Sequence, residues 1–239
     1  ANKCKNKYYL EINNMITENL KYSCASFIWA DYQDDIKSYS IGNSGVIIKK
    51  VKFKFYDNIY KKEIVSKLRR KTMQVLVVVD MQNDFIYDAL GSDEAIKIVP
   101  YVKKLIDEFD GEVIYTRDTH QKNYLETQEG KNLPVPHCII NTKGHEIISS
   151  LDTSSSIIID KPTFGSIELQ KYLQKIENLE AVTFIGVCTD ICVVSNAIMA
   201  KAFLPEVRII VDSRACAGVT KDLHEAALLV MKSCQIEVR

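Results

Sequence analysis

One stretch of the chain decides the fold: AVTFIGV, residues 181–187, together with the segment from Asp190 to Phe203 that follows it. A short, continuous apolar run is typical of a strand that is buried on both faces. The segment behind it reads as a helix, and a strand that leads directly into a helix is the first half of a βαβ unit, whose strands are parallel. Cys192 then lies at the amino-terminal end of the predicted helix.

The same alternation runs through the chain from Met73 onward. Further apolar runs predict strands at Val75–Val79, Val113–Thr116, Ile157–Ile159, Val207–Val211 and Ile236–Val238. Segments with apolar residues three and four apart lie between them and predict helices, and we place Pro100 in the first turn of one of these. The sequence therefore predicts an α/β fold, a three-layer sandwich with a mainly parallel sheet, over residues 73–239.

Residues 1–72 follow a different pattern and predict a small, basic α+β segment of unassigned role. They carry 15 Lys and Arg residues against 7 Asp and Glu residues, whereas residues 73–239 carry 16 against 24. The lysines of Lys50–Phe55 alternate with apolar residues, which favours a half-buried strand over a nucleic-acid-binding surface. The whole chain of 239 residues has no net charge, which also argues against nucleic acid as a partner.

The bulk features favour a reducing compartment. The chain begins with polar residues and has no apolar run of membrane-spanning length, so we expect a soluble, cytoplasmic protein without a membrane partner. Its seven cysteines are scattered and form no C-x-x-C pair, which predicts free thiols and argues against a structural zinc knuckle. A homo-oligomer is compatible with these features.

Three of the predicted strands end near a charged residue, namely Asp80, Asp118 or Lys161. The carboxyl ends of parallel strands meet at one edge of the sheet, where open α/β sheets bind their ligands. We therefore expect these side chains and Cys192 to lie close together. A helix cap or a surface turn is the alternative explanation for any single Asp at such a place.

Cys192 is the candidate nucleophile of this group. The unpaired N–H groups at a helix amino terminus stabilise a thiolate and lower the pKa of the thiol. The alternative is a buried, unreactive cysteine, which is the commoner role of a lone Cys. The charged groups expected around Cys192 favour the reactive thiolate.

Four motifs occur in a fixed order along the chain. They are VDMQNDF (79–85), TRDTH (116–120), DKPTFGS (160–166) and GVCTDICV (186–193). On these motifs, residues 73–239 resemble the isochorismatase-like cysteine hydrolases and, within them, the nicotinamidases. One such motif alone is weakly diagnostic, whereas four in the right order are specific. The resemblance does not extend into residues 1–72.

The resemblance implies a catalytic triad of Asp80, Lys161 and Cys192. In such a triad the Lys161 charge stabilises the Cys192 thiolate, while Asp80 takes the thiol proton and returns it to leaving ammonia. The alternative is a structural ion pair beside a buried cysteine.

The resemblance also implies the surroundings of the reacting carbonyl group. The Val187–Cys188 peptide is expected to be cis, and the backbone N–H groups of Cys188 and Cys192 are expected to form the oxyanion hole. Phe85 and Phe164 match aromatic residues that contact the substrate ring, and core packing is the alternative for both.

A metal site is implied next to the triad. Asp118 and His120 resemble the metal site of nicotinamidases, many of which add histidines soon after, and Tyr124 stands where one of these is expected. Other members use a glutamate followed by a histidine. The implied ligands in this chain are Asp118, His120, Glu129 and His137. Two carboxylates and two imidazoles suit a divalent ion, with zinc as the first choice and iron or manganese as alternatives.

Together these features predict a metal-containing cysteine amidohydrolase that converts nicotinamide to nicotinate and ammonia through a thioester, as a step of NAD salvage. The ion is expected to hold the pyridine nitrogen and to aim the carboxamide at Cys192. One alternative is a related hydrolase of another small amide, such as an N-carbamoyl or ureido compound. The other is a fusion in which the domain serves as a binding or regulatory module, or in which residues 1–72 bind an acidic partner while the domain stays active.

Overall fold

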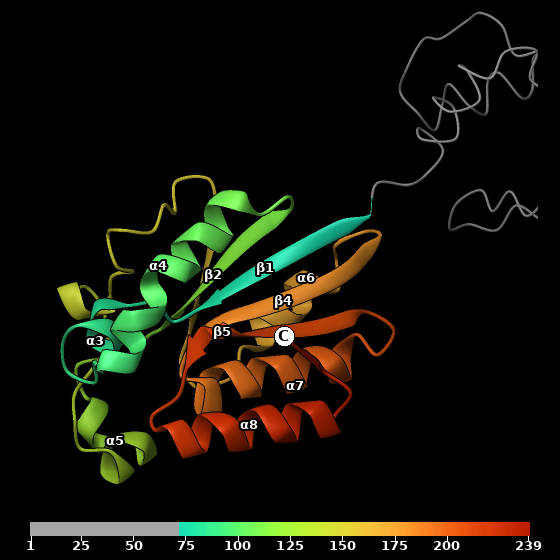
Figure 1. Ribbon diagram of the computed structural model, residues 1–239. Coiled ribbons are helices and arrows are strands. Elements are labelled where there is room, and N and C mark those ends of the chain that lie inside the picture. Colours follow the sequence, from blue (N-terminus) through green and yellow to red (C-terminus); the bar gives the residue numbers. More distant parts are fainter. Residues whose placement is uncertain (1–71) are drawn as a thin grey trace, which may run out of the picture. The chain divides into compact units, whose positions relative to one another are not determined.

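The computed structural model describes residues 72–239, so the predictions for residues 1–71, and with them the domain boundary, lie outside the described residues. Six strands form one sheet in the order β3-β2-β1-β4-β5-β6, and every neighbouring pair is parallel (Figure 1). The strands are β1 (Met73–Val79), β2 (Glu112–Asp118), β3 (Ile157–Lys161), β4 (Leu179–Val187), β5 (Arg208–Ala217) and β6 (Glu237–Val238). Each of them overlaps one of the six predicted apolar runs.

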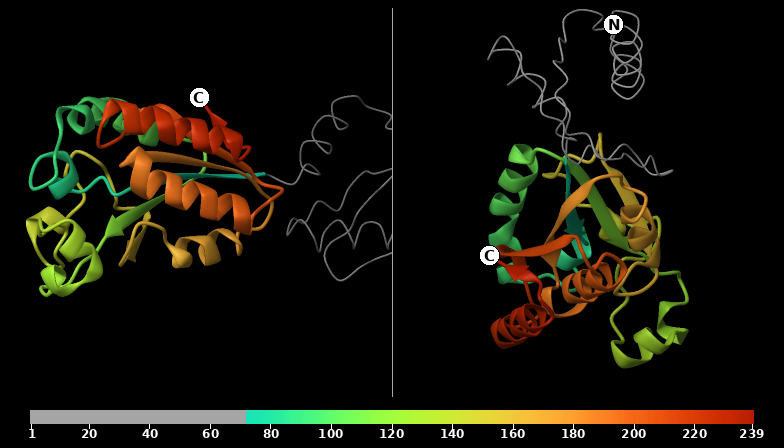
Figure 2. Two further views of the ribbon diagram at one scale, coloured as in Figure 1. Left: turned by 90° about the horizontal axis from the view of Figure 1, so that it is seen from below. Right: turned by 90° about the vertical axis from the view of Figure 1, so that its right-hand side faces the viewer.

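Helices cover both faces of this sheet. Figure 1 and Figure 2 show α4 on one side of the sheet and α7 and α8 on the other. The longer helices are α4 (Asp93–Glu108), α6 (Ile167–Leu173), α7 (Val194–Phe203) and α8 (Lys221–Ser233). The shorter ones are α3 (Asn83–Ile86), η1 (Tyr124–Glu126), α5 (Gln128–Asn132) and η2 (Lys143–His145). The predicted three-layer sandwich is confirmed.

Strand β1 contributes side chains to the hydrophobic cores on both faces of the sheet. Val75, Val77 and Val79 point into the core that includes α6, α7 and α8, whereas Leu76 and Val78 point into the core that includes α3 and α4. All five side chains are buried, and each contributes about 1.5–3 kcal/mol relative to an exposed position. A strand in the middle of a covered sheet therefore reads as a continuous apolar run and not as an alternating one.

Helix α4 begins earlier than predicted, at Asp93. Ser92 caps it, because its hydroxyl oxygen accepts a hydrogen bond from the Ala95 N–H at 3.1 Å. Pro100 lies inside the helix, so its placement in the first turn is wrong. The helix continues past this residue, which has no N–H to donate, because Val99 and Val102 bury their side chains against the sheet.

The chain makes an irregular turn where β4 ends. Gly186 has φ of 114°, and a side chain there would collide with the carbonyl oxygen of Val79 on β1. The Val187–Cys188 peptide is cis, as expected. A π-helical turn, η3 (Thr189–Val193), then precedes α7, so the helix predicted from Asp190 to Phe203 is regular only from Val194. Cys192 lies inside the π-helical turn.

Two bulk predictions concern the described residues directly. None of the helices between residues 72 and 239 is long and apolar enough to cross a membrane. The cysteines of this range are free thiols, as predicted, and they are Cys138, Cys188, Cys192, Cys216 and Cys234. Cys4 and Cys24 lie outside the described residues.

Candidate active site

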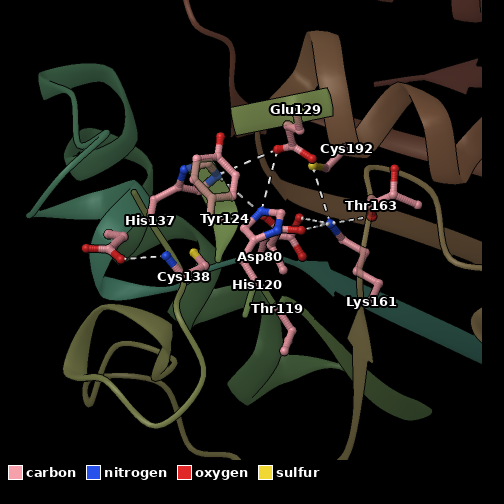
Figure 3. A network of polar contacts seen from close by, with 12 residues as sticks. Asp80, Thr119, His120, Tyr124, Glu129, His137, Cys138, Lys161, Thr163 and Cys192 are labelled. Carbon is pink, nitrogen blue, oxygen red and sulfur yellow. Dashed lines mark hydrogen bonds and ion pairs between the residues drawn. The ribbon is translucent and has the colours of Figure 1, made fainter. Parts of the chain in front are cut away.

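The four side chains expected to meet lie together at the carboxyl edge of the sheet. Figure 3 shows Asp80, Lys161 and Cys192 of this group. Asp80 follows β1, Asp118 and Lys161 are the last residues of β2 and β3, and Cys192 comes from the turn after β4. None of the four is more than 5% exposed. Parallel pairing places Asp118 directly beside Lys161 in the strand register, and the rest of the group follows from the common edge of the strands.

The Lys161 ammonium is the centre of this group. Its Nζ lies 2.7 Å from Asp80 Oδ2, 3.3 Å from Asp118 Oδ1 and 3.5 Å from Cys192 Sγ. It also donates a hydrogen bond to the carbonyl oxygen of Thr163 at 3.2 Å. A buried ammonium without such partners would lose its proton, so these contacts explain how Lys161 stays charged.

The pKa values of the group shift together. Burial works to lower the pKa of Lys161, but the charges of Asp80 and Cys192 outweigh it and hold that pKa above its ordinary value. Burial raises the pKa of Asp80 even though the Lys161 charge opposes it. Burial and the Asp80 charge also raise the pKa of Cys192 well above its ordinary value. Burial thus disfavours the thiolate predicted from the helix terminus, whereas the Lys161 charge favours it.

Asp80 is held in place at a sharp turn of the backbone. Its φ of 50° lies in the left-handed region, which is disfavoured for residues other than glycine. Thr116 on β2 donates its hydroxyl to Asp80 Oδ1 at 2.7 Å, while Oδ2 faces Lys161. Sequence reasoning did not single out Thr116, although the strand register pairs it with Val79, the residue before Asp80.

A second cluster lies beside the first and shares Asp118 with it. His120 Nε2 lies 2.8 Å from Asp118 Oδ2 and 3.5 Å from Glu129 Oε1. His137 Nε2 lies 3.6 Å from Asp118 Oδ2 and 3.8 Å from Glu129 Oε1. His120 follows β2, Glu129 lies in α5, and His137 lies in the loop that leads toward β3. The structure thus brings together all four implied metal ligands.

The donor atoms of this cluster suit a divalent cation. All four lie within 4.8 Å of one another, and ligands about 2.0–2.2 Å from one ion are spaced in this way. His137 Nδ1 lies 2.8 Å from the Val135 carbonyl oxygen, so an N–H at that position leaves Nε2 as a lone-pair donor. Within residues 72–239, the buried His120 Nε2 has no hydrogen-bond partner of suitable geometry. A buried nitrogen in this situation fits a metal ligand.

The charges of the cluster also favour a cation. Burial works to raise the pKa of Asp118, but the neighbouring His120 and His137 imidazoles and the Lys161 charge outweigh it and hold that pKa well below its ordinary value. Burial and the Asp118 charge raise the pKa of Glu129. The Asp118 and Glu129 carboxylates belong to one cluster, so their charges repel each other. A cation bound between them relieves this repulsion.

Residues 74–239 match the sequence profile of the isochorismatase domain. The chain belongs to the isochorismatase family. The resemblance inferred from the four motifs is thereby confirmed, and like those motifs it covers the α/β domain.

Individual relatives in this family agree with the match. The nicotinamidase/pyrazinamidase of Mycobacterium tuberculosis is 27% identical over 187 residues, which are 70% of this chain and 98% of that protein. The nicotinamidase of Saccharomyces cerevisiae is 26% identical over 190 residues, 59% of this chain and 87% of that protein. The crystal structure of the pyrazinamidase of Pyrococcus horikoshii in complex with zinc superposes with a TM-score of 0.62 at 31% identity, covering 70% of this chain and 98% of that one.

Two aromatic rings pack against the imidazole rings of His120 and His137. Tyr124, which stands where a further histidine was considered, has its ring centroid 4.7 Å from that of His120 and 5.0 Å from that of His137. Its hydroxyl donates to the Leu133 carbonyl oxygen at 2.9 Å. The Phe85 ring lies 5.4 Å from His137. Tyr124 and Phe85 thus limit the movement of the imidazole rings.

The remaining predicted site residues lie around this centre. Phe85 is half-buried in α3, while Phe164 follows β3, is 41% exposed and belongs to neither buried core. Core packing therefore does not explain Phe164. Cys188 precedes the π-helical turn that contains Cys192, and burial raises the pKa of the Cys188 thiol to about 12. The Cys188 thiol therefore stays neutral.

Gln82 holds the backbone of the candidate ligand Asp118, and sequence reasoning did not single it out. Its fully buried amide donates to the Asp118 carbonyl oxygen at 2.8 Å and accepts from the Asp118 N–H at 2.7 Å. It also donates to the His145 carbonyl oxygen at 2.9 Å. The amide thus pairs with Asp118 as a neighbouring strand would. A polar residue next to a buried strand in the family motif VDMQNDF was the available signal, because a buried amide needs partners.

Proposed function

We propose that residues 73–239 form a metal-containing cysteine amidohydrolase that converts nicotinamide to nicotinate and ammonia. One observation carries the proposal: the Lys161 ammonium is within reach of the Asp80 carboxylate and the Cys192 thiol at once. A nucleophile, a proton acceptor and a cation in one buried group are what acyl transfer from an amide requires. The names of the relatives, nicotinamidases and a pyrazinamidase, support an aromatic carboxamide as the substrate.

The first half of the reaction forms a thioester. Asp80, whose pKa is raised by burial, accepts the Cys192 proton, and the Lys161 charge stabilises the thiolate as it forms. The sulfur attacks the carboxamide carbon and forms the S–C bond. The C–N bond then breaks, and the proton held by Asp80 passes to the nitrogen, which leaves as ammonia.

The second half of the reaction releases the product. A water molecule attacks the thioester carbon while Asp80 accepts one of its protons. The C–S bond breaks and the proton held by Asp80 returns to the Cys192 sulfur, so that the enzyme regains its starting state. The acid that forms gives up its remaining proton to solvent and leaves as nicotinate. Each tetrahedral oxyanion is stabilised by the N–H groups of Cys188 and Cys192, each contributing about 3–4 kcal/mol.

The substrate ring is positioned by the second cluster and by aromatic side chains. Asp118, His120, Glu129 and His137 would hold a divalent ion, zinc in the first place, which would supply a coordination position for the pyridine nitrogen. The zinc complex of the Pyrococcus horikoshii relative supports this choice of metal. Phe85 and Phe164 contact the ring and exclude water from the thioester until hydrolysis.

The proposal is tested by the release of ammonia from nicotinamide. Purified full-length protein should release ammonia, and Cys192→Ala should reduce the rate to background. Cys234→Ala, which removes an exposed thiol far along the chain, is the matched control and should keep full activity. Activity retained in Cys192→Ala would refute the proposal, and faster release from an N-carbamoyl or ureido compound would favour the alternative substrate class.

We also propose that the activity belongs to residues 73–239 alone. The family match begins at residue 74, which supports a boundary near Met73. A protein of residues 73–239 should hydrolyse nicotinamide with the kcat and KM of the full chain. A large loss of activity in a well-folded truncated protein would show that residues 1–72 take part.

A further inference from the structure

One buried amide outside the triad and the metal cluster joins two segments of the site. Asn196 lies in the first turn of α7, and its side chain is fully buried. Its Oδ1 accepts a hydrogen bond from the Ser166 N–H at 2.9 Å. Its Nδ2 donates to the Phe164 carbonyl oxygen at 3.0 Å and to the Cys192 carbonyl oxygen at 2.8 Å. Both amide hydrogens and the amide oxygen are therefore engaged.

The first joined segment is the loop from Lys161 to Ser166. At one end the Lys161 ammonium donates to the Thr163 carbonyl oxygen at 3.2 Å. At the other end Ser166 caps α6, because its hydroxyl accepts from the Leu169 N–H at 3.1 Å. The loop is thus tied to the ammonium through Thr163 and to Asn196 through the backbone of Phe164 and Ser166.

The second joined segment is the π-helical turn that contains Cys192. A π-helical turn departs from the regular pairing of backbone groups in an α-helix, and the Cys192 carbonyl oxygen receives the Asn196 side chain as a donor. Because Asn196 donates to both carbonyl oxygens, it fixes the distance between the peptide groups of Cys192 and Phe164. The buried position excludes water as a replacement for this amide.

We propose that Asn196 is a positioning residue that sets the place of the Cys192 sulfur relative to the substrate ring and to the Lys161 ammonium. The inference rests on the proposed function, since it takes Cys192 as the nucleophile and Phe164 as a ring contact. Loss of the amide releases the loop and the turn from each other. A shift of about 1 Å in reacting atoms reduces a rate by about 100-fold, so the effect falls on catalysis as well as on folding.

The test compares two buried amides that lie next to each other. Asn196→Leu keeps the approximate shape and removes all three hydrogen bonds. Gln170→Met is the matched control, because Gln170 is also fully buried and its amide bonds to the Asn196 carbonyl oxygen at 3.5 Å. In full-length protein with nicotinamide, Asn196→Leu should lower kcat by about 10- to 100-fold and raise KM several-fold. Gln170→Met should keep both constants within about twofold of the wild type.

A purely structural role predicts a different result. Asn196→Leu would then unfold at a lower temperature but would keep the wild-type kcat and KM well below that temperature, and this outcome would overturn the inference. Asn196→Asp is a second variant, which keeps an oxygen for the Ser166 N–H but has at most one hydrogen to donate, so that the Phe164 or the Cys192 carbonyl oxygen loses its donor. It should show the same loss of kcat, and wild-type kcat in this variant would also overturn the inference.

Cys192→Ala separates the two levels of the proposal. Hydrolysis that persists in Cys192→Ala contradicts the proposed function itself. An inactive Cys192→Ala together with wild-type constants in Asn196→Leu contradicts the positioning role alone. If Asn196→Leu does not fold, the kcat of Asn196→Asp decides between the two outcomes.

Discussion

Lys161 and Asp118 lie side by side at the ends of adjacent strands, with Nζ of the lysine 3.3 Å from Oδ1 of the aspartate. The other oxygen of the same carboxylate, Oδ2, lies 2.8 Å from His120 Nε2. One buried carboxylate thus belongs both to the group around Cys192 and to the candidate metal cluster. A change in the charge of either group therefore acts directly on the other.

Replacing Lys161 by Met should abolish hydrolysis and lower the free energy of unfolding by about 3–5 kcal/mol, because it leaves the Asp80 and Asp118 carboxylates buried without their cation. Urea denaturation measures the loss. The double variant Asp80→Asn/Lys161→Met should recover part of the stability without activity. Lys103→Met, which breaks an exposed pair with Asp107, is the control and should change stability by less than about 1 kcal/mol. Similar losses in Lys161→Met and the control would contradict the prediction.

Replacing Gln82 by Met should weaken zinc binding by about 10- to 100-fold, because the peptide of the candidate ligand Asp118 loses both of its hydrogen bonds to the amide. Calorimetric titration of metal-free protein with zinc gives the affinity independently of activity. Gln170→Met, which removes another fully buried amide, should bind zinc as the wild type does. Unchanged affinity in Gln82→Met would mean that Asp118 keeps its position without the amide.

Replacing Glu129 by Gln should lower the zinc affinity by about tenfold or more, since the variant keeps the shape of the side chain and removes one of two carboxylates from the cluster. Glu126→Gln changes an exposed residue of the same segment and serves as the control. Equal affinities of the two variants would remove Glu129 from the set of ligands.

Tyr115 should make stability depend on pH above the neutral range. Its hydroxyl donates to the Asp152 carbonyl oxygen at 3.0 Å, which contributes about 1 kcal/mol. Burial and the Asp152 charge raise the pKa of Tyr115 to about 12, against about 10 in the unfolded chain. The unfolded chain therefore releases its proton first, and stability present below pH 10 is lost as the pH rises toward 12.

The Tyr115→Phe variant measures this effect. Near pH 8 it should be less stable than the wild type by about 1 kcal/mol, because the hydrogen bond is missing. Near pH 11 the wild type loses about 1.4 kcal/mol through ionisation of its unfolded chain, so the variant should equal or exceed it. Urea denaturation at both pH values gives the two differences. A gap that does not change with pH would contradict the raised pKa.

The strands were predictable because a strand that is buried on both faces consists of a continuous run of apolar residues, which is visible in the sequence. All six apolar runs lie in or overlap a strand, and β1 shows the continuous pattern directly. The two errors have tertiary causes. Pro100 is accepted inside α4 because the buried face of that helix outweighs one missing hydrogen bond. The first turn after β4 is π-helical and not α-helical, which no periodicity in Asp190–Phe203 indicated.

The site was predictable where a charged residue ends a strand, as Asp118 and Lys161 do, or directly follows one, as Asp80 does. Glu129 and His137 were accessible only through the resemblance, because their loop and short helix have no periodic pattern. The partners that hold these groups were not foreseen. The Gln82 amide acts on a residue of another strand, and that contact depends on how β1 and β2 pair.

By itself, the sequence determined the succession of strands and helices in residues 73–239 and the kinds of charged group at the strand ends, because hydrophobic periodicity and residue type are local properties. Only the tertiary structure decided that the Cys192 thiol is buried beside the Lys161 ammonium, and that Asp118 is shared by two clusters. Removal from water and the distance between remote segments set both of these features, and neither quantity exists before the chain has packed.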